Sequence, residues 1–236
     1  MSIAEPPAPS VAETAASATP RRVRGFEKNR LEALADGVFA VALTLLVLDI
    51  KLPEQTFTSN DELWRRLVEL ERHFAIYVIS FVVIGMYWIS HHIQFHFIRY
   101  TDRRLIWINM LYLLLISFVP FATDLMGDHK DLILPCEIYG FTLLLLSGMS
   151  FLHLDYLSRH PYLATHELTP EVVGLVKRRI LLFTAIPLTS MLLAFHSTHL
   201  AVYSYLLLVL AHFFTGPVDE RIHTLPAEDA GAEDSP

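Results

Sequence analysis

Apolar residues fall in long blocks along the chain, and most charged residues lie between these blocks. A helix needs about 20 mostly apolar residues to cross the hydrocarbon core of a bilayer. By this measure the sequence predicts six spans, at residues 31–50, 73–98, 104–124, 132–154, 174–195 and 198–215. The expected fold class is therefore all-α, a polytopic membrane protein with six transmembrane helices.

Polar segments flank these blocks and define the expected domains. Residues 1–25 are rich in Ala, Pro, Ser and Thr and contain no apolar signal region, so we expect a disordered cytoplasmic tail. Residues 26–216 form the expected six-helix transmembrane domain, and residues 217–236 an acidic, disordered cytoplasmic tail. Within segment 62–72, the leucines at 63, 67 and 70 share one helical face, which predicts a helix that continues into the second span.

Composition and charge support a membrane protein and give its orientation. With 53% hydrophobic and 18% charged residues, the chain is too apolar for an ordinary soluble domain. Thirteen of the 18 Lys and Arg residues lie on the side that holds both termini. The positive-inside rule therefore predicts a multi-pass protein of the cell (inner) membrane with both termini in the cytoplasm. The single cysteine, Cys136, excludes an intramolecular disulfide.

The first span combines a charged residue with an apolar stripe. Asp36 lies about two turns into the span, where a carboxylate is costly unless it faces a protein interior or water. Beyond it, four residues recur at helical spacing on one face, namely Val41, Thr44, Leu45 and Leu48. Periodicity alone leaves three interpretations of this stripe open, because a packing seam and a lipid-facing surface look the same as a pore lining.

The first span begins with Arg30, followed after three residues by Leu34, Ala35, Asp36 and Gly37. This run resembles the signature of the transmembrane protein 175 (lysosomal-type) potassium channel family, whose first helix begins with Arg-x-x-x-Phe-Ser-Asp-Gly. Leu34 and Ala35 thus replace the aromatic residue and the serine. The second and third spans carry further matches, at Trp88, His91, His92, Asn109, Pro120 and Phe121. The chain resembles the prokaryotic, single-repeat form of the family.

This resemblance implies a homotetrameric channel in the lipid bilayer, with the first helix of each subunit lining the pore. Val41 would form the narrowest ring of a hydrophobic gate, followed by Thr44, Leu45 and Leu48, and potassium would pass in modest preference to sodium. The resemblance also implies a structural polar network at the cytoplasmic end, formed by Arg30, Asp36, Trp88, His91, His92 and Asn109.

Two other function classes remain open on the sequence alone. His91, His92 and His96 on one helix, with His153 and Asp155 on another, suggest a metal or haem membrane protein. Asp36 with the histidine pair suggests a proton-coupled transporter. The chain carries no Walker-type loop, no Gly-x-Ser-x-Gly elbow and no paired-cysteine site. We therefore expect no enzyme, no cofactor or metal, and no nucleic-acid partner.

Overall fold

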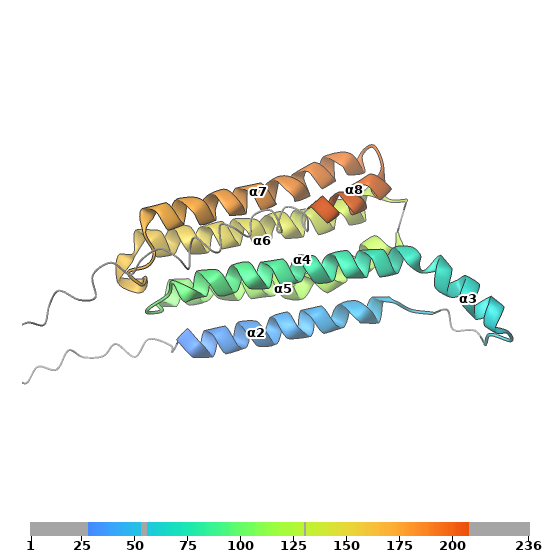
Figure 1. The fold of residues 1–236 in the computed structure, drawn as a ribbon, viewed down its shortest axis with the longest axis horizontal. Coiled ribbons are helices and arrows are strands. Elements are labelled where there is room, and N and C mark those ends of the chain that lie inside the picture. The colour runs from blue at the N-terminus through green and yellow to red at the C-terminus, as the bar shows by residue number, and fades with distance from the viewer. Residues whose placement is uncertain (1–27, 53–55, 130, 208–236) are drawn as a thin grey trace, which may run out of the picture.

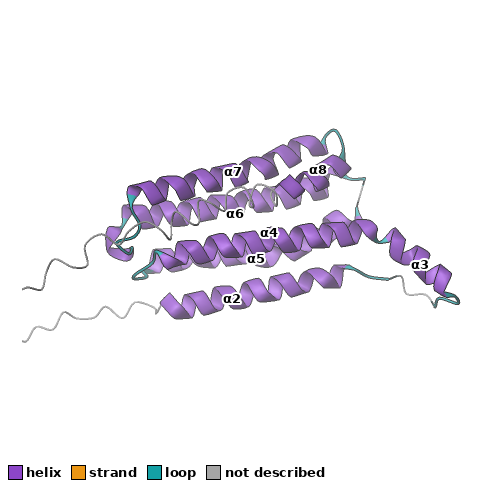
Figure 2. Ribbon diagram, in the orientation of Figure 1, coloured by secondary structure: helices purple, strands orange, loops and turns teal. Residues whose placement is uncertain are grey.

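The computed structural model describes residues 28–52, 56–129 and 131–207, which form helices joined by short loops (Figures 1 and 2). The long helices are α2 (Lys28–Leu45), α4 (Glu71–His96), α5 (Arg103–Asp128), α6 (Ile133–Arg159) and α7 (Pro170–Ala194). The short ones are α3 (Asn60–Glu69), α8 (Thr198–Ser204) and two 3-10 turns, η1 (Leu46–Asp49) and η2 (Pro161–Leu163). The predicted all-α class is confirmed for these residues.

Side-chain caps fix where several helices begin. The carboxylate of Asp102 accepts a hydrogen bond from the Leu105 backbone N–H at 2.8 Å and so caps α5. Thr169 caps α7 in the same way, and Pro170 follows in the first turn, where no N–H is needed. These caps satisfy backbone donors that have no partner within their own helix.

The long helices run side by side in a bundle, with α2 along one edge and α7 along the opposite edge (Figure 1). α2 packs against α4 and α5, α5 packs against α6, and α6 packs against α7. α3 projects away from the bundle beyond the end of α4 (Figure 1). Among the described residues, the helix α2 therefore has packing partners on one side only.

The bundle places many polar side chains inside and apolar ones outside. Leu114 and Leu192 are 63% and 74% exposed, whereas polar side chains from three helices are buried, namely Ser80, His91, Gln94, Asn109, Thr123, Thr142, Ser147, Ser150 and His153. This is the arrangement expected where the surrounding solvent is hydrocarbon, because polar groups must then find partners within the protein.

Four of the described helices are long and apolar enough to span a bilayer: α2 with η1, α4, α5 and α6. The multi-pass prediction is thus supported. α7 covers the fifth predicted span. Because three basic residues lie at 177–179, its uninterrupted apolar run is too short for it to count among the candidate membrane spans. Of the sixth predicted span, α8 and the residues up to Leu207 are described; the rest, with the predicted tails 1–25 and 217–236, lies outside the described residues.

The predicted continuity between segment 62–72 and the second span is wrong. α3 ends at Glu69 and α4 begins at Glu71, and Leu70 between them has ψ near 3°. Its backbone N–H bonds back to Leu67 within the last turn of α3. An apolar face shared by neighbouring turns does not predict such a break, because the periodicity of apolar residues carries no information about the backbone angles of a single residue.

Candidate ion pathway and its supporting network

The helix α2 has two faces of different character. The inner face holds Leu31, Ala35, Phe39, Ala42 and Leu46, all buried against the bundle. These residues recur at spacings of three and four, which keeps them on one side of the helix. Ala35, which replaces the family's serine, is 1% exposed and thus belongs to this packed face.

The opposite face carries the predicted pore-lining residues, and all of them are exposed in the single chain. Val41 is 57% exposed and Leu48 is 61% exposed; Leu45 and Thr44 lie between them on the same face. The Thr44 hydroxyl donates to the Val41 carbonyl oxygen at 2.9 Å, which leaves its own oxygen available as an acceptor. These residues thus form one exposed stripe on α2, and their role as a pore lining stays a prediction.

Asp36 lies at the junction between α2 and α4. The indole nitrogen of Trp88 donates a hydrogen bond to Asp36 Oδ1 at 2.9 Å. The Trp88 ring stacks on His92, with ring centroids 5.9 Å apart, and His92 Nδ1 lies 3.5 Å from Glu32 Oε1. Asp36, Trp88, His92 and Glu32 therefore form one cluster that joins the two helices.

His91 faces the bundle interior and belongs to a second group. Its Nε2 lies 2.8 Å from Asn109 Oδ1 on α5. Its ring stacks on Phe95 and Tyr112 and packs against Phe39 of α2, with centroid distances of 4.3, 5.2 and 5.8 Å. Because Asn109 is 1% exposed, this polar contact is shielded from solvent. Five of the six predicted network residues thus lie in two adjacent clusters.

Arg30, the sixth, is not part of either cluster. It is exposed near the start of α2, and within the described residues it forms no hydrogen bond or ion pair with Asp36, His91 or His92. Its place in the network stays a prediction.

The three histidines of α4 that suggested a metal site each have a separate partner. His91 contacts Asn109, His92 contacts Glu32, and His96 Nε2 lies 2.9 Å from Glu167 Oε2. Among the described residues, no group of three or more His, Cys, Asp or Glu side chains is placed to hold a metal ion.

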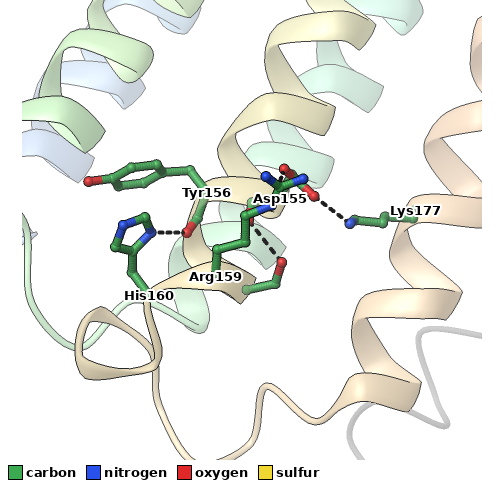
Figure 3. Close-up of polar contacts among 6 residues, drawn as sticks. Asp155, Tyr156, Arg159, His160 and Lys177 are labelled. Carbon is green, nitrogen blue, oxygen red and sulfur yellow. Dashed lines mark hydrogen bonds and ion pairs between the residues drawn. The ribbon is translucent and has the colours of Figure 1, made fainter.

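Asp155, the acidic residue of the metal-site hypothesis, lies near the end of α6 and forms ion pairs with two basic residues instead. Its two carboxylate oxygens contact Lys177 Nζ of α7 at 2.7 Å and Arg159 Nε at 2.9 Å (Figure 3). The neighbouring Tyr156 hydroxyl donates to Asp102, the cap of α5, at 2.5 Å. This group ties α5, α6 and α7 together at the end of the bundle.

Three further buried polar residues, which are not part of the motifs, bond to one another inside the bundle: Gln94, Ser150 and His153. Gln94 donates from Nε2 to the Ser150 hydroxyl at 2.6 Å, and its Oε1 lies 2.9 Å from His153 Nδ1. The sequence signal for Gln94 and Ser150 is a polar residue within an apolar span, but only the fold pairs residues that are more than 50 positions apart.

Comparisons with known proteins match this part of the chain. A family model described as the endosomal/lysosomal potassium channel TMEM175 matches residues 30–120, which contain most of α2, all of α4 and most of α5. A potassium channel of Streptomyces collinus is 41% identical over 103 residues, covering 44% of this chain and 49% of that protein. One of Chamaesiphon minutus is 39% identical over 103 residues, covering 44% and 51%.

The endosomal/lysosomal proton channel TMEM175 of Homo sapiens is 32% identical over 120 residues, covering 45% of this chain and 23% of that protein. The chain thus spans about half the length of the bacterial relatives it matches, and less of the human one.

A solved structure extends the similarity over most of the chain. It is the crystal structure of a lysosomal potassium-selective channel TMEM175 homolog from Chamaesiphon minutus, with a TM-score of 0.67 and 28% identity. The match covers 81% of this chain and 97% of that one. With the family motifs placed on α2, α4 and α5, the bacterial relatives at about 40% identity and this shared helical fold, the chain is similar to the TMEM175 family, chiefly over residues 30–120.

Proposed function

We propose that this protein is a potassium channel whose pore is lined by α2. The observation that carries the proposal is the exposed face of α2, where Val41, Thr44, Leu45 and Leu48 form a stripe that nothing else in the described chain covers. An exposed apolar face on a helix whose other face is packed fits a pore wall completed by further copies. The names of the bacterial relatives, all potassium channels, support the same ion.

The mechanism is a hydrophobic constriction. A narrow apolar ring at Val41 loses its water, so an ion crosses only where partial dehydration is tolerable. Potassium holds its hydration shell less tightly than sodium and so crosses in modest preference. The Thr44 oxygen, about one turn further along, faces the same side and replaces part of the lost shell.

A pore of this kind requires several subunits. One helix cannot enclose a channel, and a closed ring of identical chains with α2 innermost places four Val41 side chains at one level in a homotetramer. Asp36 with Trp88 holds each pore helix to α4, and His91 with Asn109 joins α4 to α5 behind it. The distribution of basic residues supports an inner-membrane protein with cytoplasmic termini.

Proton permeation is a second candidate, because the matched vertebrate relatives are named proton channels. The proton-coupled transporter left open by the sequence differs from both channels, because potassium would move through it only when a proton gradient is present.

Flux from potassium-loaded liposomes tests these functions. We expect passive potassium efflux that persists when an ionophore dissipates any proton gradient. Efflux that stops under this condition would indicate a coupled transporter. Acidification of the liposomes without potassium efflux would favour the proton channel.

A further inference from the structure

A small cavity lies inside the bundle, behind the inner face of α2. Its volume is about 10 Å³, and its walls come from α4, α5 and α6, with lining residues His91, Gln94, Asn109, Tyr112, Ser150 and His153. A cavity of this size is at the lower limit for a single water molecule. All six of its lining residues carry polar groups, so it differs from the dry apolar voids that stay empty.

Two polar atoms of this lining have no hydrogen-bond partner. They are Asn109 Nδ2 and His153 Nε2. The residues are only 1% and 5% exposed, so bulk solvent does not satisfy them. A buried polar group without a partner costs roughly 1–3 kcal/mol, and such groups in native proteins are usually bonded to ordered water.

The neighbouring hydrogen bonds assign complementary roles to these two atoms. His153 Nδ1 lies 2.9 Å from Gln94 Oε1, and a carbonyl oxygen only accepts. Nδ1 therefore carries the proton, and Nε2 of the neutral ring is an acceptor. The Asn109 oxygen is already bonded to His91, so its free Nδ2 is a donor.

We propose that this cavity binds one ordered water, which accepts from Asn109 Nδ2 and donates to His153 Nε2. A water molecule supplies both functions at once. It closes a continuous hydrogen-bonded chain from His91 through Asn109, the water, His153 and Gln94 to Ser150. This chain links α4, α5 and α6, and it does not depend on which ion the protein conducts.

The water also makes His153 a positioning residue for the pore helix. The His153 ring stacks on Phe95 at 5.6 Å, Phe95 stacks on His91 at 4.3 Å, and His91 packs against Phe39 at 5.8 Å. Phe39 belongs to the buried face of α2. The orientation of His153, fixed by hydrogen bonds at both ring nitrogens, is thus transmitted to α2 through three ring contacts.

Solid-state NMR of the full-length protein in lipid bilayers, with ¹⁵N-labelled histidine and asparagine, tests this site. Polarisation is transferred from water protons to the side-chain nitrogens. We expect His153 to be neutral, protonated at Nδ1, with a water cross-peak at its unprotonated Nε2 and another at Asn109 Nδ2. Absence of both cross-peaks, in a sample where exposed His166 gives one, would overturn the proposal.

A substitution assigns the signals and tests the bridge. His153→Phe keeps a ring that stacks on Phe95 but removes the acceptor, so the water cross-peak of Asn109 should fall to the noise. Thr142→Val is the matched control, because it removes a buried hydroxyl from the same helix, bonded to Ile138 at 2.7 Å and away from the cavity. A cross-peak that survives in folded His153→Phe would overturn the bridge; if this variant does not fold, the wild-type spectrum decides.

Discussion

At the scale of single residues, Asp36 illustrates how a carboxylate is accommodated in an apolar helix. It is exposed on α2 within one chain, and the indole N–H of Trp88 bonds to it at 2.9 Å. Trp88 in turn stacks on His92, whose partner Glu32 lies on α2 one turn before Asp36. The cluster therefore both solvates the charge and fastens α2 to α4.

Trp88→Phe removes the donor and leaves Asp36 without this partner. A hydrogen bond to a charged group contributes about 1.5–3 kcal/mol when buried, and at this partly exposed site we expect a loss near the lower value. Thermal unfolding of the purified protein measures this loss of stability. Trp107→Phe, at an exposed indole with no such bond, is the matched control. Equal effects of the two substitutions would mean that the hydrogen bond contributes nothing.

Val41→Ala tests the proposed constriction. Removing two methyl groups from each subunit widens the narrowest ring and eases its hydration, so we expect higher single-channel conductance and a lower preference for potassium. Val78→Ala on α4, at a side chain of similar exposure, should leave both quantities unchanged. Unaltered currents in Val41→Ala would remove this residue from the constriction.

The sequence alone predicted the contacts of some of these side chains and not of others. His91 and Asn109 stand within motifs and meet in the structure, and Asp36 was identified by its cost in an apolar helix. His153 was considered only as a metal ligand, whereas its ring nitrogen contacts Gln94. Such pairings depend on how the helices rotate against each other, which a pattern along one helix does not encode.

At the scale of elements, the first four spans were predicted to within about five residues, because hydropathy fixes helix length in a bilayer. The second span was predicted at 73–98 and is α4, Glu71–His96; the third was predicted at 104–124 and is α5, Arg103–Asp128. The break at Leu70 was missed, since both flanking segments favour helix. The contact between α6 and α7 had no sequence signal beyond the small residue Gly140.

Gly140 sets how closely α6 approaches its neighbours. A Cβ at this position would lie 2.5 Å from Met191 Cγ of α7 and 3.2 Å from the Tyr205 hydroxyl. Gly140→Ala should therefore destabilise the protein by about 1–3 kcal/mol, the usual cost of overpacking. Gly148→Ala, on the same helix with open space around it, should be neutral or stabilise by up to about 1 kcal/mol. The two unfolding midpoints give the comparison, and a shift of the same sign and size in both would contradict this packing.

At the scale of the whole molecule, the proposed function requires more than one chain. One face of α2 is buried against the bundle, while its other face is largely apolar and exposed. The similarity to a TMEM175 homolog over 97% of that chain supports the same bundle arrangement. A pore then requires copies of α2 to face one another around an axis.

Cysteine cross-linking tests this arrangement. In a Cys136→Ala background, which removes the only native thiol, Val41→Cys should yield oxidised dimers on denaturing gels, because the ring is narrow at this level. Leu192→Cys is the control, since that side chain is 74% exposed on α7, at the opposite edge of the bundle (Figure 1). Dimers from Leu192→Cys alone would place α7 rather than α2 at the subunit contact.

The most direct test of the account is the current through purified protein in planar bilayers, with potassium on one side and sodium on the other. The account predicts a passive current whose reversal potential is shifted toward the potassium equilibrium value. A preparation shown to be folded and oligomeric that carries no cation current would contradict it.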